Sequence, residues 1–104
     1  MVTVKDIFVG DIGTRFRAIV KDRDDVPVDI SDAFVKNIEF TDPSGTVVSV
    51  AGSFTTNGED GKLEYIVVTG DFLDTAGTWL YRAFVQYPGG ERHTSQAEFV
   101  VWAL

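Results

Sequence analysis

The sequence predicts an all-β protein in which two antiparallel sheets stack face to face. Turn-forming residues recur about every 8 to 12 positions along the 104-residue chain. The segments between these turns are short and rich in β-branched and aromatic residues. No window of helical length keeps an apolar repeat of about 3.6 residues, and the nearest candidate, residues 71–76, is long enough only for a single turn.

The turn signals divide the chain into seven expected strands. The turns are placed at Gly10–Gly13, Asp22–Asp25, Asp42–Gly45, Asn57–Gly61, Thr75–Gly77 and Pro88–Gly90. The strands are expected at Val4–Val9, Thr14–Lys21, Phe34–Thr41, Thr46–Phe54, Lys62–Val68, Thr78–Tyr87 and Glu91–Trp102. Apolar residues alternate along them, at Phe16, Ala18 and Val20 in the second strand and at Leu63, Tyr65 and Val67 in the fifth. Each strand therefore offers one apolar face to a core.

The third and fourth strands can be aligned, because residues that pair across a hairpin point to the same face of the sheet. Pairing Asp42 with Thr46 places Lys36 opposite Gly52. A buried, unpaired lysine is costly, so we expect a bulge or a sheet edge at this point. The same alignment predicts three apolar pairs on the core face: Phe40 with Val48, Ile38 with Val50, and Phe34 with Phe54.

The last hairpin is expected to have a three-residue loop of Pro88, Gly89 and Gly90. In such a loop a type I turn is followed by a left-handed residue, so Gly90 should have a positive φ. Tyr87 then pairs with Glu91. Continuing this register predicts that Trp79 faces Phe99, Tyr81 faces Ala97 and Val85 faces His93.

Seven short antiparallel strands in about 100 residues are typical of an immunoglobulin-like β-sandwich, and the whole chain, residues 1–104, is expected to form one such domain. Trp79 follows the turn before the penultimate strand, where these sandwiches often place a corner aromatic residue. We expect its side chain to be a buried anchor. No cysteine is present, so an antibody-type domain with its disulfide is excluded.

The composition excludes several classes of protein. Sixteen acidic and nine basic residues give a net charge of −7, which disfavours nucleic-acid binding. Arg15, Arg17 and Lys21 alternate with apolar residues, and we interpret them as the solvated side of a strand. No apolar run is long enough to span a membrane, and the first residues lack the features of a signal peptide.

No constellation of residues indicates catalysis, so we expect a protein that is not an enzyme and has no cofactor or small-molecule substrate. His93 is the single histidine and lacks a nucleophile motif. The acidic pairs Asp24–Asp25 and Glu59–Asp60 lie in turns rather than across a cleft. Calcium remains an alternative to ordinary solvated turns, although no metal site is predicted. Its candidate ligands are Asp22, Asp24, Asp25 and Asp29 in one loop and Asn57, Glu59 and Asp60 in another.

Parity along the last two strands predicts one apolar outer surface. The neighbours of the core-facing residues must point outward if the core face carries Trp79, Tyr81, Ala97, Phe99 and Val101. The outward-pointing neighbours are Leu80, Phe84, Val100 and Trp102. Large apolar residues that share an outer face favour a protein interface. Arg82, Gln96 and Glu98 interrupt this surface, and Trp102 could instead fold over the sandwich edge.

The sequence resembles the immunoglobulin-like N-terminal domain of phage baseplate upper proteins and related tail and fibre proteins. The resemblance covers nearly the whole chain. It rests on the segments Val9–Thr14, Val28–Ala33, Asp42–Thr46, Asp74–Trp79 and Tyr87–Gly90, in this order. Members of that family usually continue into a stalk or receptor-binding region, whereas this sequence ends at Leu104, which favours an adaptor, accessory or decoration role.

The resemblance implies a non-enzymatic structural protein of a bacteriophage virion, in the tail, baseplate or neck, assembled in the bacterial host cytoplasm. Its expected partners are other virion proteins and itself as a homo-oligomer, with no nucleic acid and no membrane. The alternative is a carbohydrate-binding or adhesin-like sandwich, for which Trp102, or Tyr87 with Arg92, would supply the aromatic platform. A small hydrolase would need a cleft that so compact a sandwich seldom contains.

Overall fold

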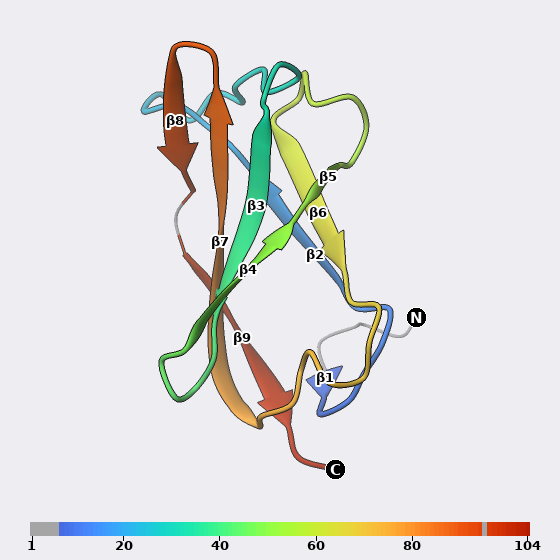
Figure 1. Cartoon of the computed structure of the whole chain (residues 1–104). Helices are drawn as coiled ribbons and strands as arrows, with labels where there is room; N and C mark the ends of the chain where they lie inside the picture. Colours follow the sequence, from blue (N-terminus) through green and yellow to red (C-terminus); the bar gives the residue numbers. More distant parts are fainter. Residues whose placement is uncertain (1–6, 95) are drawn as a thin grey trace.

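The computed structural model describes residues 7–94 and 96–104, and these form two β-sheets packed face to face (Figure 1). The larger sheet has the order β1-β9-β7-β3-β4, with β8 also paired with β7, and the smaller sheet has the order β2-β6-β5. The strands are β1 (Ile7–Phe8), β2 (Arg15–Ile19), β3 (Val35–Thr41), β4 (Val47–Ala51), β5 (Ser53–Phe54), β6 (Lys62–Ile66), β7 (Gly77–Tyr87), β8 (Gly90–His93) and β9 (Ala97–Trp102). The all-β prediction is confirmed.

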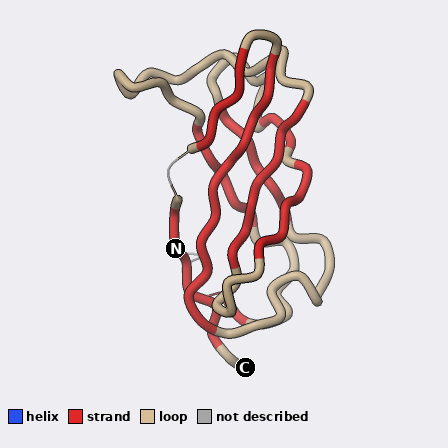
Figure 2. Tube along the Cα trace, turned by 60° about the vertical axis from the view of Figure 1, so that its left-hand side comes forward, coloured by secondary structure: helices blue, strands red, loops and turns tan. Residues whose placement is uncertain are grey.

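The strand order is that of an immunoglobulin-like sandwich. Such a fold places its second, fifth and fourth strands in one sheet and its third, sixth and seventh strands in the other. When β4 and β5 are counted as one divided strand, and β8 and β9 as another, β2-β6-β5 and β3-β7-β9 reproduce these two sets. The larger sheet is mixed rather than wholly antiparallel, because β1 runs parallel to β9. Figure 2 shows strands and loops only, and no described segment is a helix that could cross a membrane.

Gly52 divides the expected fourth strand into β4 and β5, which belong to different sheets. β4 pairs with β3, whereas β5 pairs with β6. The N–H of Gly52 donates to the carbonyl of Lys36 at 2.7 Å, and a Cβ on Gly52 would lie 3.4 Å from the carbonyl of Glu64. A Cβ at this distance would make an ordinary van der Waals contact, so Gly52 marks the point where the chain crosses between the sheets without being required there by lack of space.

This crossing determines which of the pairs predicted between the third and fourth strands form. The pairs Phe40–Val48 and Ile38–Val50 are confirmed. Lys36 still pairs with Val85 of β7, and the pairing of β3 with β4 ends where its carbonyl accepts the N–H of Gly52. The pair Phe34–Phe54 is wrong, because β5 has left the sheet of β3, and Phe34 is 64% exposed. The ammonium group of Lys36 lies 4.5 Å from the ring centre of Phe54, so a cation–π contact satisfies this lysine.

The last hairpin differs from the prediction at its tip. Tyr87 pairs with Gly90 across a two-residue loop, and the positive φ of 97° belongs to Gly89 instead of Gly90. Proline followed by a glycine of positive φ is the pattern of a type II turn. Val85 therefore lies opposite Arg92, and the predicted pairing of Val85 with His93 is wrong.

The register is nevertheless as predicted beyond the tip, where Trp79 faces Phe99 and Tyr81 faces Ala97. The connection between β8 and β9 accounts for this, because it shifts the pairing by one residue. At Thr94 the side-chain oxygen accepts the N–H of Ala83, and the Thr94 N–H donates to the Ala83 carbonyl.

Aromatic rings fill the space between the sheets at the end where β1 lies. Phe16 of β2 packs against Phe40 of β3 and Phe99 of β9, with ring centres 5.0 and 4.6 Å apart. Trp79 is 3% exposed, stacks on Phe99 and donates its indole N–H to the carbonyl of Thr75 at 2.8 Å. The predicted burial of Trp79 is confirmed. Smaller side chains, including Val20, Leu63 and Val85, form the core at the other end.

Candidate interaction surface

The four predicted interface residues lie on the outer face of the larger sheet. β7 runs through the middle of that sheet, and its alternate residues Trp79, Ala83 and Val85 are buried against the smaller sheet. Leu80 and Phe84 lie between them in sequence, so they point to the opposite face and are partly exposed. In β9, Val100 is 39% and Trp102 53% exposed, next to the buried Val101.

Phe8 enlarges this surface. β1 places Phe8 beside Trp102, with Ile7 buried and Phe8 37% exposed. We call Phe8, Leu80, Val100 and Trp102 the apolar patch. Sequence reasoning missed Phe8, because nothing in the sequence indicated which strand the first strand would join. Had Ile7 been assigned to the core, alternation along the strand would have placed its neighbour Phe8 on the outer face.

An ion pair separates Phe84 from the apolar patch. Arg82 lies between Leu80 and Phe84 on the outer face of β7, and its Nε lies 2.9 Å from a carboxylate oxygen of Glu39 on β3. Phe84 instead packs its ring against His93, with the ring centres 4.6 Å apart. The corrected register explains this contact, because it places His93 opposite Phe84 on the outer face. The four predicted residues thus share a face but form two separate groups.

The acidic loops use their side chains to hold turns. The carboxylate of Asp22 accepts the backbone N–H groups of Asp24 and Val26, and that of Asp29 accepts both the N–H and the hydroxyl of Ser31. The bonds from Ser31 lower the pKa of Asp29 below its ordinary value. Across residues 7–94 and 96–104, no group of three or more histidine, aspartate or glutamate side chains is placed to hold a metal ion.

The second acidic loop is built in the same way. The amide oxygen of Asn57 accepts the N–H of Glu59, and the carboxylate of Asp60 accepts the hydroxyl of Thr56 and the N–H of Lys62. These bonds, chiefly the one from Thr56, lower the pKa of Asp60. The sequence interpretation of these residues as turn formers agrees with this geometry.

The aromatic residues considered for carbohydrate binding lie far apart in the fold. Tyr87 ends β7 at the hairpin loop, where its hydroxyl accepts the Arg92 Nε–H at 2.9 Å. Trp102 ends β9 at the opposite end of β7, because β9 pairs with β7 from Gly77 to Tyr81. Any aromatic platform built on Trp102 would therefore have Phe8 as its neighbour rather than Tyr87.

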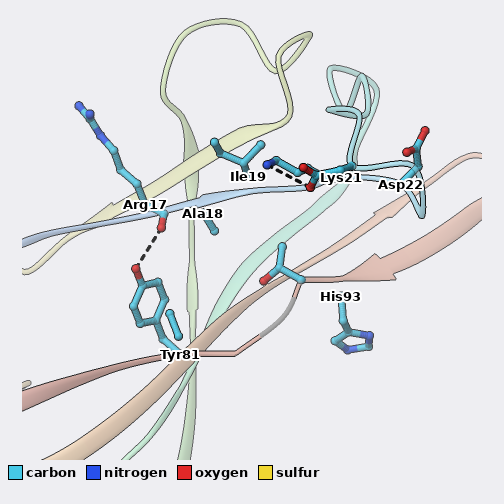
Figure 3. A pocket seen from close by; sticks show the side chains of 10 residues that line it. Arg17, Ala18, Ile19, Lys21, Asp22, Tyr81 and His93 are labelled. Atoms are coloured by element: carbon cyan, nitrogen blue, oxygen red, sulfur yellow. Dashed lines mark hydrogen bonds and ion pairs between the residues drawn. The ribbon is translucent and has the colours of Figure 1, made fainter.

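A hollow of about 470 Å³ opens along the edge where β2 faces the connection between β8 and β9 (Figure 3). Tyr81 crosses its floor and donates its hydroxyl to the carbonyl of Arg17 at 3.1 Å. Burial raises the pKa of Tyr81. At the far end, the ammonium group of Lys21 lies 3.3 Å from the carboxylate of Asp25.

Comparison of the sequence with known protein families and with curated proteins finds no match. A functional proposal therefore rests on the surface of the fold, and the resemblance to phage proteins stays a prediction from sequence.

Proposed function

We propose that this protein is a non-enzymatic structural or adaptor protein that acts by burying the outer face of its larger sheet against a partner protein. One observation carries the proposal. The apolar patch places a half-exposed tryptophan beside Phe8 and Val100, with Leu80 further along the same face of the sheet, which does not line the core. Such groups are uncommon on the surface of a monomer.

The surroundings of the patch support this reading. Specific interfaces combine a few large apolar anchors with a polar rim, and tryptophan is the most enriched anchor. Here the rim consists of Glu98 opposite Leu80 and the ion pair between Arg82 and Glu39. These charged groups can fix the orientation of a partner, while the apolar patch supplies most of the binding free energy.

We further propose that the partner is another protein of a bacteriophage virion, at the tail, baseplate or neck. The sequence resemblance supports this context. The net charge of −7 favours a different protein over a second copy, because two copies repel each other and a less acidic partner does not. The same charge keeps the free subunit soluble before assembly.

Antibody labelling of purified phage particles tests the virion context, and the expected result is labelling at one defined position. A glycan array tests the alternative of a carbohydrate-binding module. An assembly protein should give a blank array. Binding of a glycan that Trp102→Ala abolishes would instead favour the carbohydrate-binding function and contradict the proposal.

A further inference from the structure

The smaller sheet has an open edge along β2. Among the described residues, β2 pairs only with β6. The N–H of Val20 donates to Gly61, and the N–H of Val67 donates to Thr14. In an antiparallel ladder every second residue directs both its N–H and its C=O toward the partner strand, and the residues between them direct theirs away. Thr14 and Val20 are residues of the first kind. The backbone groups of Arg15, Arg17 and Ile19 therefore face away from β6.

Two hollows lie side by side along this edge. The hollow of Figure 3 follows β2 from Arg17 to Lys21, and a second, of about 460 Å³, follows it from Gly13 to Phe16. Tyr81 lines both, and Ala97 and Phe99 of β9 form the opposite wall. Together they give a groove along the whole length of β2, which at about 3.3 Å per residue accommodates an extended segment.

The outer face of the smaller sheet beside the groove carries more basic than acidic side chains, whereas the carboxylates of Asp22, Asp25 and Glu98 line the groove itself. Arg15 and Arg17 share a single carboxylate, that of Glu64, with N···O distances of 3.5 and 3.7 Å. Their side chains are 49% and 57% exposed, whereas that of Glu64 is only 15% exposed. Two guanidinium groups thus face one carboxylate, in a protein that is otherwise strongly acidic.

We propose that β2 binds an extended acidic segment of a different protein, which adds to the smaller sheet as a new edge strand. The main-chain groups of Arg15, Arg17 and Ile19 would hydrogen-bond to this segment. Its residues opposite the arginines would be acidic, and its alternate residues, opposite Phe16 and Ala18, would be small and apolar and point toward Tyr81. This surface is separate from the apolar patch of the proposed function.

The charges select against a second copy as the occupant. Two β2 strands paired antiparallel about a two-fold axis at Arg17 would place Arg17 opposite Arg17, and like charges opposite one another are destabilising. Charged residues on an edge strand commonly prevent such self-pairing. An acidic strand converts the same charges into attraction.

Tyr81 modulates access to the edge. Its hydroxyl occupies the carbonyl of Arg17, which an incoming strand would need as an acceptor. Tyr81→Phe removes this competing donor and keeps the ring in the floor of the groove. We therefore expect this variant to bind an acidic strand a few times more tightly, consistent with the modest net value of one hydrogen bond.

The test uses the whole protein and a peptide of roughly ten residues in which glutamate alternates with valine or threonine. Its matched controls have the same sequence with N-methyl groups on alternate residues, in either frame, so that one control lacks the donors that face β2. We expect the unmodified peptide to bind and to slow hydrogen exchange at the amides of Arg15, Arg17 and Ile19. One N-methylated control should bind at least tenfold more weakly. Equal binding of all three peptides, or no binding, would overturn the proposal.

Two variants make the test specific to β2. Ile19→Pro removes an N–H that faces away from β6, and proline is tolerated at such edge positions. It should abolish peptide binding, whereas the matched control Ile19→Thr keeps the N–H and should bind normally. Arg17→Glu should weaken binding of the glutamate peptide and favour a lysine version, which decides the matter even if Ile19→Pro unfolds. Trp102→Ala should leave peptide binding unchanged, so this test and that of the apolar patch fail independently.

Discussion

The two tight hairpins of the larger sheet have the same spacing of proline and glycine but form different loops. Between Asp42 and Thr46 the loop is Pro43, Ser44 and Gly45, and Gly45 has a φ of 92°. The N–H of Asp42 donates to the carbonyl of Thr46 at 2.9 Å, which closes a three-residue loop. After Tyr87 the same three positions are Pro88, Gly89 and Gly90, yet the loop closes one residue earlier.

The residue after the proline and the carboxylate before it both favour the longer loop at Asp42, and the second hairpin has neither. Ser44 has a Cβ, which disfavours a positive φ, so the left-handed position falls to Gly45. Gly89 has no Cβ and takes the positive φ itself, which completes a type II turn. A carboxylate reinforces the first loop, since Asp42 accepts the N–H groups of Ser44 and Thr46 and the hydroxyl of Ser44. The loop chemistry thus sets the register close to each turn.

Further from the turn, core packing sets the register. The one-residue shift in the β8–β9 connection returns Trp79 to the position opposite Phe99, where the two rings stack 5.9 Å apart. Shifting β9 by one residue would turn Phe99 and Val101 away from the core. The cost of exposing these side chains exceeds the cost of an irregular connection.

Trp79→Ala removes a ring whose packing in the core helps to set the register of β9, and it should lower the stability of the protein more than the loop substitutions do. Truncating a buried tryptophan typically costs about 3 to 5 kcal/mol, because apolar contacts are lost and a cavity remains. Chemical denaturation measures this loss. A loss below about 1 kcal/mol would mean that the register of β9 does not depend on this ring.

Gly89→Ser gives the second loop the Pro-Ser-Gly sequence of the first. We expect the loop to lengthen to three residues, with a positive φ at Gly90 and Tyr87 paired with Glu91, at a cost of no more than about 2 kcal/mol. Nuclear Overhauser contacts between Tyr87 and Glu91 would show the new pairing. A two-residue loop that persists, with the introduced serine at a positive φ, would contradict the explanation above.

Ser44→Gly tests the first loop in the opposite direction and should have a smaller effect. The Asp42 carboxylate still accepts the N–H groups of residues 44 and 46, so the three-residue loop should remain. The loss should be about 0.5 to 1 kcal/mol, from the greater freedom of glycine in the unfolded chain. Conversion to a two-residue loop would show that the serine Cβ, rather than the carboxylate, holds the register.

Asp42→Asn should have the smallest effect at neutral pH and a distinct effect in acid. The hydroxyl of Ser44 is the main cause of the lowered pKa of Asp42, followed by the N–H of Thr46. A lowered folded-state pKa stabilises the protein above the unfolded-state pKa, and this stabilisation is lost as the pH falls through the folded-state value. The asparagine variant should therefore lose less stability than the wild type below about pH 4. An equal fall in the melting temperatures of the two proteins as the pH is lowered would contradict this prediction.

Alternation along single strands could be predicted well from the sequence, and sheet membership could not. Parity correctly placed Trp79 in the core and Trp102 on the outer face, because these placements follow from the period of the strand. The crossing at Gly52 depends on the pairing of β5 with β6 rather than with β3. No local pattern distinguishes such a glycine from one in an ordinary bulge.

The same limit applied to the candidate surfaces. The four outer-face residues were found by parity, but their division by Arg82 and Glu39 depends on the pairing of β7 with β3, for which the sequence offered no alignment. Phe8 was missed for the same reason. The open edge of β2 depends on the strand order of the smaller sheet, and its arginines could be interpreted from sequence only as a solvated face.

If the protein is part of a phage particle, as proposed, incorporation of Trp102→Ala into particles, compared with that of Val68→Ala, shows whether the apolar patch is the contact surface. Val68 is 70% exposed and follows β6 in the smaller sheet, so it controls for the loss of an exposed apolar side chain elsewhere. We expect both variants to melt like the wild type and only Trp102→Ala to lose incorporation, because truncating an aromatic anchor commonly costs about 2 kcal/mol or more of binding. Normal incorporation of a folded Trp102→Ala protein would contradict the claim that the apolar patch is the contact surface.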